Sequence, residues 1–278
     1  MAASIEDSIR GLAQSRALPW GGRGPVLDVW DVAELAGRHG LPGHEIEALA
    51  LDLDVTPARY LRNRRSISRE DQIRLLRARL AMVGLGGLGG SLLEQFLRLG
   101  VGRVRAADGD RFEASNLNRQ ALSTLDGLGR DKAHAARLRA GEVNPSITLE
   151  TRSEFLTIET LPGFLDGCAL AVDALGGLAM RGHLQQAASE AGIPLVTGAL
   201  AGWTGYVAVV MPGRIGPADL MGTDNGGEER LGCPAPAVNL VASLMAMEVV
   251  NVLTGAPTLA DKMLVADLRS HTFETVSL

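Results

Sequence analysis

The chain has 278 residues, of which 46% are hydrophobic and 21% are charged, and its formal net charge is −5. These values are those of a globular protein whose core is large enough to be stable without disulfides or structural metals. Negative net charge gives no overall attraction to nucleic acid or to an anionic membrane, so we expect neither as a partner. The two cysteines, Cys168 and Cys233, form no Cys-x-x-Cys pair and predict neither a disulfide framework nor a zinc site.

The first residues include acids and lack the apolar segment of a secretory signal. We find no run of about 18 apolar residues, the length that a membrane span needs. The sequence therefore predicts a cytoplasmic protein without a membrane span.

The chain divides near residue 58 into parts with different patterns. Residues 1–57 are predicted to be a small helical N-terminal appendage, and residues 58–278 a larger domain. The helical patterns in and just after the appendage lie near 3–14, 28–38, 43–52 and 69–78. A stretch rich in glycine and proline at 19–25 indicates a loop between the first two helices. What the appendage does is not indicated by its sequence.

From residue 79 onwards, short apolar runs alternate with helical patterns. Strands are predicted at 80–83, 101–107, 147–151, 169–172, 194–199, 203–210, 262–267 and 272–276. Helices are predicted after residue 90 and at 132–143, 178–191 and 235–253. Strands that alternate with helices predict an α/β fold of Rossmann-like type, with a mostly parallel sheet and helices on both faces. The later strands are expected to pair antiparallel, which makes the sheet mixed.

A glycine turn joins the first strand of this domain to the next helix. Gly84, Gly86 and Gly89 have the Gly-x-Gly-x-x-Gly spacing, and Gly87 lies in the same turn. These glycines permit a tight turn, close approach of a phosphate to the backbone, and close helix–strand packing. The following helix N-terminus offers N–H donors to phosphates, and Asp108, at the end of the second strand, can accept hydrogen bonds from ribose hydroxyls. The combination predicts a nucleotide site without distinguishing NAD, FAD and ATP.

The segment after Asp108 favours ATP. It presents polar and charged side chains in a region with no regular pattern, namely Asp110, Ser115, Asn116, Asn118, Arg119 and Gln120. Arg119 can bind phosphate oxygens through two N–H groups, and Lys132 adds a second positive charge near a helix start. A hydride-transfer enzyme does not need this cluster. On spacing alone, a solvated loop with a surface arginine and lysine remains the alternative.

Together these residues resemble the ThiF/MoeB/HesA family, relatives of the adenylation domain of ubiquitin-activating enzymes. The matching segments are 84–90, 108–110, 115–120, the helix start at Lys132, 143–145, 173–175, 198–199 and 245–248. Upstream, the string from Arg59 to Arg62 is similar to an Arg-Tyr-x-Arg motif of the family. The resemblance covers roughly residues 58–278.

The resemblance implies an ATP-dependent adenylyltransferase that activates the C-terminal carboxylate of a small ubiquitin-like or sulfur-carrier protein. The products would be an acyl-adenylate and pyrophosphate, with Mg²⁺ required and a Gly-Gly tail on the carrier. It assigns Asn116, Arg119 and Lys132 to the phosphates, and implies a homodimer in which Arg62 reaches the partner subunit's site. Asp110 and Gln120 complete the expected nucleotide site.

One departure from the family concerns the metal. In ungapped alignment, Gly176 stands where the family has an aspartate that helps to hold Mg²⁺, and glycine has no side chain to bind a metal. Asp110 or Asp173 could substitute; otherwise the chain would be a relative that binds nucleotide and carrier but has lost adenylation. An NAD-dependent oxidoreductase is a third reading. The zinc-binding cysteine pairs of many relatives are missing, so no zinc is expected.

Cys233 lies just before the predicted helix at 235–253. Some relatives have a sulfur-accepting or thioester cysteine in this region, and a helix N-terminus can lower the pKa of a thiol. Cys233 is therefore a candidate nucleophile, and the alternative is a small apolar loop residue. The glycine-rich stretch at 222–232 is either a mobile crossover above the carrier tail or a connector without a role.

Overall fold

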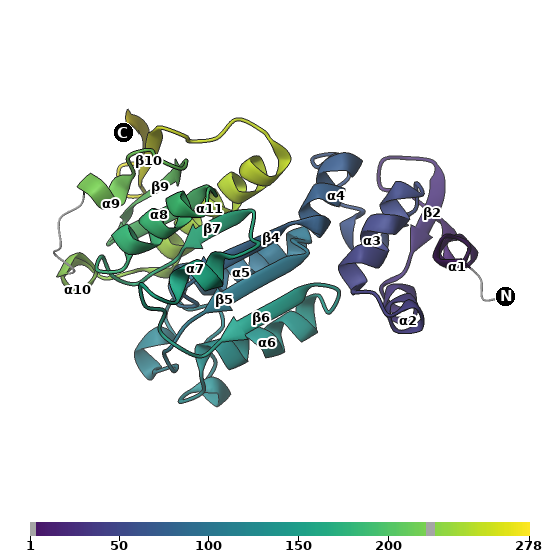
Figure 1. The fold of residues 1–278 in the computed structure, drawn as a ribbon, viewed down its shortest axis with the longest axis horizontal. Coiled ribbons are helices and arrows are strands. Elements are labelled where there is room, and N and C mark those ends of the chain that lie inside the picture. The colour runs from purple at the N-terminus through teal and green to yellow at the C-terminus, as the bar shows by residue number, and fades with distance from the viewer. Residues whose placement is uncertain (1–3, 221–225) are drawn as a thin grey trace.

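The computed structural model describes residues 4–220 and 226–278. A small N-terminal module leads into a larger α/β domain (Figure 1). The module contains α1 (Ile5–Leu12), β1 (Gln14–Ala17), β2 (Arg23–Leu27), α2 (Val29–His39), α3 (Gly43–Asp52) and β3 (Thr56–Pro57). The predicted helices are present. Three short strands, which were not predicted, form a sheet beside them in the order β1-β2-β3.

Local sequence signals explain the elements of this module. The β1–β2 hairpin turns through Gly21 and Gly22, whose φ angles of 98° and 77° lie in the region that favours glycine. A capping box at Asp28 begins α2, and Gly40, in the left-handed conformation, ends it. The helices and β2 share a small core that includes the fully buried Leu35.

The larger domain is built on one sheet of eight strands. Its strands are β4 (Arg79–Val83), β5 (Arg103–Ala107), β6 (Thr148–Arg152), β7 (Leu170–Asp173), β8 (Leu195–Ala201), β9 (Thr204–Val210), β10 (Lys262–Asp267) and β11 (Thr272–Ser277). The order is β11-β10-β9-β8-β7-β4-β5-β6. Pairs from β8 to β6 are parallel, whereas β8–β9, β9–β10 and β10–β11 are antiparallel. The predicted mixed, mostly parallel sheet is confirmed.

Helices cover both faces of this sheet, as Figure 1 shows. The helices of this domain are α4 (Arg69–Arg77), α5 (Gly87–Leu99), α6 (Lys132–Val143), α7 (Leu161–Leu165), α8 (Arg181–Glu190), α9 (Pro217–Leu220), α10 (Gly226–Leu231) and α11 (Ala235–Thr254), with short 3-10 turns at Ala58–Tyr60, Ala114–Asn116 and Leu125–Gly127. Alternate residues of β4 point to opposite faces. Leu80 and Met82 pack in the core that includes side chains of α5, α6 and α11, and Ala81 and Val83 in the core that includes those of α7 and α8.

Helix α11 has 20 residues and, by length and composition alone, is apolar enough to cross a membrane. In this fold it lies against α5, β8 and β9. Val241, Met245 and Val249 on its inner face are buried in the main core. Its apolar character is therefore that of a core helix, and the remaining described helices do not meet the criteria for a span.

A buried polar network fixes the N-terminal module to the larger domain. Glu47 on α3 is fully buried, and its carboxylate accepts hydrogen bonds from the Tyr60 hydroxyl at 2.9 Å and the Ser146 hydroxyl at 3.2 Å. Burial raises the pKa of Glu47, against the opposing effect of these hydrogen bonds and of Arg59. Arg59 also donates to the Val143 carbonyl at 2.8 Å. In this chain, Arg59 and Tyr60 therefore hold the two parts together.

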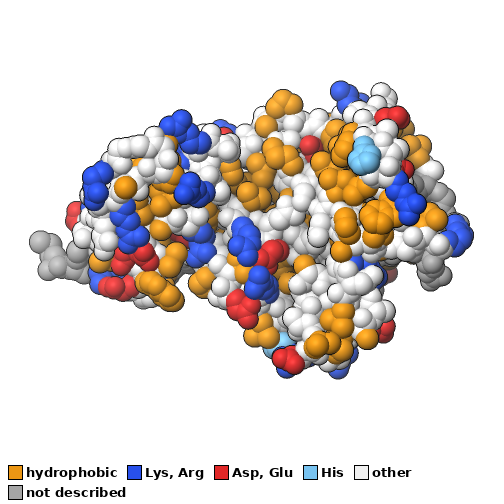
Figure 2. Space-filling view, turned by 180° about the vertical axis from the view of Figure 1, so that it is seen from behind, with side chains coloured by type: hydrophobic (Ala, Val, Ile, Leu, Met, Phe, Trp, Pro, Cys, Tyr) orange, Lys and Arg blue, Asp and Glu red, His pale blue; other side chains and the backbone are white. Residues whose placement is uncertain are grey.

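Figure 2 shows that Lys and Arg side chains gather at the end of the molecule formed by the N-terminal module, and hydrophobic side chains at the opposite end. The nucleotide site that the sequence predicts lies in the larger domain. It is placed where β4 is flanked by β5 on one side and β7 on the other. Parallel sheets bind ligands outside the carboxyl ends of strands at such a switch in strand order.

Candidate nucleotide site

The turn between β4 and α5 requires glycine at two positions. Gly84 has a φ of 103°, and a Cβ atom there would lie 2.3 Å from the Ala174 carbonyl oxygen. A Cβ atom at Gly89 would lie 2.0 Å from the Gly84 carbonyl oxygen. The absence of side chains lets α5 begin directly against β4 and β7. The N-terminus of α5 consequently opens toward the space at the ends of these strands.

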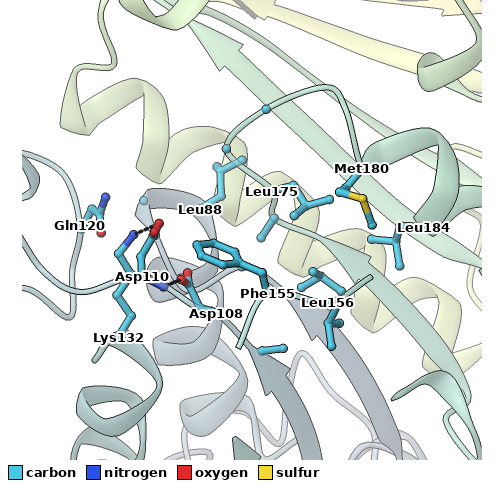
Figure 3. A pocket seen from close by; sticks show the side chains of 18 of the residues that line it. Leu88, Asp108, Asp110, Gln120, Lys132, Phe155, Leu156, Leu175, Met180 and Leu184 are labelled. Carbon is cyan, nitrogen blue, oxygen red and sulfur yellow. Dashed lines mark hydrogen bonds and ion pairs between the residues drawn. The ribbon is translucent and has the colours of Figure 1, made fainter. Parts of the chain in front are cut away.

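The carboxylate of Asp108 is held against this turn (Figure 3). One oxygen accepts a hydrogen bond from the Leu85 backbone N–H at 2.7 Å, and the other accepts from the Asp110 N–H at 2.8 Å. Two backbone donors fix the orientation of the carboxylate and leave lone pairs for further donors. Asp108 lines the cavity in front of the turn, where a ribose would meet it.

That cavity has a volume of about 490 Å³ and is lined at one end by polar and at the other by apolar side chains. The size is within the range of ligand pockets, roughly 300–1,000 Å³. The polar end contains Asp108, Asp110, Asn116, Arg119, Gln120 and Lys132. The apolar end is lined by Phe155, Leu156, Leu161, Leu175, Met180 and Leu184, most of which are labelled in Figure 3. This division suits a nucleotide, with phosphates at the polar end and a base at the apolar end.

Lys132 and Gln120 are buried polar groups of the phosphate end. The Lys132 ammonium is paired with the Asp110 carboxylate at 3.0 Å, and 7% of its side chain is exposed. Gln120 is also 7% exposed, and its Oε1 atom has no hydrogen-bond partner among the described residues. A buried amide atom without a partner costs about 1–3 kcal/mol, which a ligand would recover. Because the two amide orientations are interchangeable, the group can offer either a donor or an acceptor.

Arg119 and Asn116 come from the same loop. The Nη1 atom of Arg119 donates to the Ser115 carbonyl and to the Asn118 side chain, both at 3.0 Å, which fixes the guanidinium at the cavity wall. Asn116 caps the short 3-10 turn by accepting from the Glu113 N–H at 3.1 Å. Both predicted residues thus lie at the cavity with Lys132.

Arg62 does not lie at this site. It is exposed on the segment after Tyr60 and is absent from the cavity lining. Over the part of the chain that the structure describes, its side chain makes no recorded hydrogen bond or ion pair. One copy of the chain therefore does not bring Arg62 to its own nucleotide cavity.

The prediction that Asp173 holds a metal is not supported by its geometry. Asp173 is 1% exposed, and its carboxylate is bound by Arg181 at 2.8 Å, by the Thr197 hydroxyl at 2.7 Å and by the Leu175 N–H at 3.1 Å. These donors occupy the oxygens that a metal would need. Arg181 lies on the first turn of α8 and holds Asp173 in place. No pattern in the sequence distinguishes it from the other arginines.

Gly176 lies in the loop between β7 and α8 and lines the cavity. Cys233 also lines it, beside Val238 at the start of α11, whereas Cys168 is buried in the core on the opposite face of the sheet. The predicted crossover at 222–232 falls partly on residues 222–225, which lie outside the described residues. Its remainder includes α10.

The apolar end of the cavity was not predicted. Phe155 and Leu156 follow β6, and Leu175 and Met180 follow β7, so that residues far apart in sequence meet there. Phe155 is 71% exposed although it is large and apolar, and its ring lies over Gly109, where a Cβ atom would be 2.6 Å away. The place of this exposed ring at the cavity wall is visible only in the fold.

This fold and site define a nucleotide-binding α/β protein. The model of the ThiF family matches residues 60–278, and the chain belongs to this family. It is 35% identical over 223 residues to a sulfur carrier protein adenylyltransferase of Thermus thermophilus, covering 75% of this chain and 82% of the relative. It is 29% identical over 217 residues to a sulfur carrier protein ThiS adenylyltransferase of Escherichia coli, covering 76% and 86%. The chain is an adenylyltransferase, and thus a nucleotidyltransferase.

Solved structures share the fold. The structure of E. coli MccB with ATP has a TM-score of 0.69 at 17% identity, covering 79% of this chain and 71% of that one. The structure of PaaA has a TM-score of 0.66 at 21% identity, covering 88% and 73%.

Proposed function

We propose that this chain uses ATP and Mg²⁺ to adenylate the C-terminal carboxylate of a small ubiquitin-like or sulfur-carrier protein with a Gly-Gly tail, and that it acts as a cytoplasmic homodimer. One observation carries the proposal: a single cavity combines the glycine turn and Asp108 with Arg119 and Lys132. The relatives named above act on sulfur carrier proteins, which supports the acceptor.

The cavity suggests a role for each group. Asp108 would accept hydrogen bonds from the ribose, and the N–H groups at the start of α5 would face the phosphates. Arg119 and Lys132 would neutralise charge as the carboxylate attacks the α-phosphate and pyrophosphate leaves. Asn116 and Gln120 would supply neutral hydrogen bonds. The chain itself provides no covalent step here, so that positioning and charge stabilisation account for the rate.

Mg²⁺ would reach this site mainly as a nucleotide complex. Within residues 4–220 and 226–278, no group of three or more His, Cys, Asp or Glu side chains could hold a metal ion. Mg²⁺ commonly binds one or two carboxylates together with phosphate oxygens. Asp110, which is 54% exposed and lies beside Lys132, is the carboxylate best placed for this purpose. The absence of zinc stays a prediction for metal analysis.

Homodimer formation is supported by the location of Arg62. Arg62 lies outside the nucleotide cavity of its own chain and is exposed, as a residue that acts in the partner's site must be. Mixing inactive Arg62→Ala and Arg119→Ala proteins tests this role. If Arg62 acts across subunits, mixed dimers regain one intact site, and if it acts within its own chain, activity stays absent.

Cys233 is the candidate for a second step, because it lines the same cavity. Its thiolate would attack the acyl carbon of the adenylate, forming a thioester as the bond to AMP breaks and AMP leaves. In a Cys233→Ser protein, adenylation would persist while a thioester, or a sulfurated carrier, would no longer accumulate. Unchanged carrier sulfuration in this variant would exclude the role.

Two other functions are each suggested by a single feature of the site. A relative that binds nucleotide and carrier without adenylation is suggested by Gly176, and an NAD-dependent oxidoreductase by the glycine turn alone. Arg119 and Lys132 at the cavity's polar end favour a triphosphate over a dinucleotide. Thermal unfolding with ATP·Mg²⁺ and with NAD separates these ligands, because a ligand that binds only the folded state raises the melting temperature. A shift with NAD alone would overturn the proposal.

A further inference from the structure

A second cavity adjoins the nucleotide cavity, and we name it the β8–β10 groove after the strands that line it. Its volume is about 470 Å³. Gly176, Gly177 and Leu200 line both cavities, so that the groove meets the nucleotide cavity at the loop between β7 and α8. A chain lying in the groove would bring its terminal carboxylate into the nucleotide cavity at this junction.

The lining of the groove is apolar and built largely from small residues. Its walls include Ala199 and Ala201 of β8, Gly205 and Tyr206 of β9, and Met263 and Val265 of β10. The charged residue among its described lining is Arg181, and this guanidinium is bound to Asp173 at 2.8 Å. An extended, uncharged segment fits this lining, because a charged side chain would lose its hydration here without gaining a partner among the described lining residues.

The absence of a side chain at Gly176 leaves space at the junction of the two cavities. The backbone conformation does not require glycine at this position. Its φ angle is not positive, and a Cβ atom there would meet nothing within 4 Å. Gly84 is the contrasting case, since a Cβ atom there would strike the backbone. The loop is held in place because Arg181 donates to the Leu175 carbonyl and, at 3.0 Å, to the Gly177 carbonyl. Gly176 is exposed, so the space above it is open and is bounded on one side by a loop that is held in place.

We infer that this space takes a side chain of the substrate, so that the enzyme activates C-terminal residues larger than glycine when the last residues are uncharged. The inference rests on the proposed adenylation and specifies its substrate class. The occupant of the groove is the C-terminal segment of a protein or peptide, made of small or apolar residues. Where the final residue is larger than glycine, its side chain is uncharged and lies over Gly176.

The test uses one carrier protein with four tails, ending in Gly-Gly, Gly-Ala, Gly-Ser and Gly-Asp, and measures carrier-dependent ATP–pyrophosphate exchange. The wild-type enzyme should use Gly-Ala and Gly-Ser within about fivefold of Gly-Gly, and Gly-Asp should fall by more than about tenfold. Gly176→Val fills the space. It should lower kcat/KM for Gly-Ala and Gly-Ser by at least about tenfold more than for Gly-Gly.

Gly141→Val is the matched control. Gly141 lies on α6, lines neither cavity and also has nothing within 4 Å of a Cβ atom. This variant should keep the wild-type tail preference. Wild-type enzyme that rejects Gly-Ala while using Gly-Gly would overturn the inference, as would an equal loss for all tails in Gly176→Val. Absence of exchange with every tail would instead contradict the proposed adenylation itself, and the inference with it.

Discussion

Replacing Lys132 by methionine tests the phosphate end of the cavity with little effect on the fold. The ammonium pairs with Asp110, whose side chain is 54% exposed. A pair with one exposed partner contributes about 0–1 kcal/mol to the free energy of unfolding. Methionine keeps the volume of the buried stem, so we expect the change in unfolding free energy to stay within that range.

The effect on activity should be larger. A hydrogen bond to a charged group is worth about 1.5–3 kcal/mol, which corresponds to a fall in kcat/KM of roughly 10- to 150-fold. ATP–pyrophosphate exchange measures this fall, and urea unfolding measures stability. In the urea measurement, Asp110→Asn is the control, because it removes the ion pair and keeps the ammonium. Exchange within threefold of wild type in Lys132→Met would refute the assignment of Lys132 to the phosphates.

Further predictions concern the junction of the two modules and the glycine turn. Tyr60→Phe removes a donor to buried Glu47 and should lower the unfolding free energy by about 1–3 kcal/mol in urea titrations; a change below about 0.5 kcal/mol would contradict this. Burial lowers the pKa of His44 in the folded protein below its unfolded value of about 6.5. The contribution of His44 to the free energy of unfolding is therefore complete above the unfolded pKa and is lost as the pH falls through the folded pKa. The free energy of unfolding of His44→Leu should therefore fall less between pH 7.5 and pH 5.5 than that of the wild type. An equal fall in both proteins would refute the lowered pKa of His44. Gly89→Ala should abolish the melting shift caused by ATP, because a Cβ atom there would lie 2.0 Å from a carbonyl oxygen, whereas Gly141→Ala should retain it.

Regular elements with strong boundary signals could be predicted from the sequence. The helix expected at 132–143 has these bounds in the structure, because Asn144 and Pro145 end it. The strands β1 and β2 could not be predicted in the same way. Both strands are short, β1 is mostly exposed, and β2 is buried only at Val26 and Leu27. Pairing across a glycine turn, which no local pattern shows, makes them strands.

The site likewise has one part that could be predicted from the sequence and one part that could not. Its polar end could be predicted, because the glycine turn, Asp108 and the segment up to Arg119 follow one another in the chain. Its apolar end is formed where the loops after β6 and β7 converge, and no local pattern marks Phe155 for it. Asp173 has the strand-end position of a ligand, but Arg181 neutralises it through a contact that only the fold reveals.

The most direct test of adenylation is ATP–pyrophosphate exchange with Mg²⁺ and a carrier ending in Gly-Gly, with Arg119→Ala as the control. We predict exchange that depends on the carrier and is lost in the variant. Such a result would also show that Gly176 is compatible with catalysis. Measurable ATP binding without exchange, across several carriers, would contradict the account and indicate a relative that binds nucleotide but has lost the chemistry.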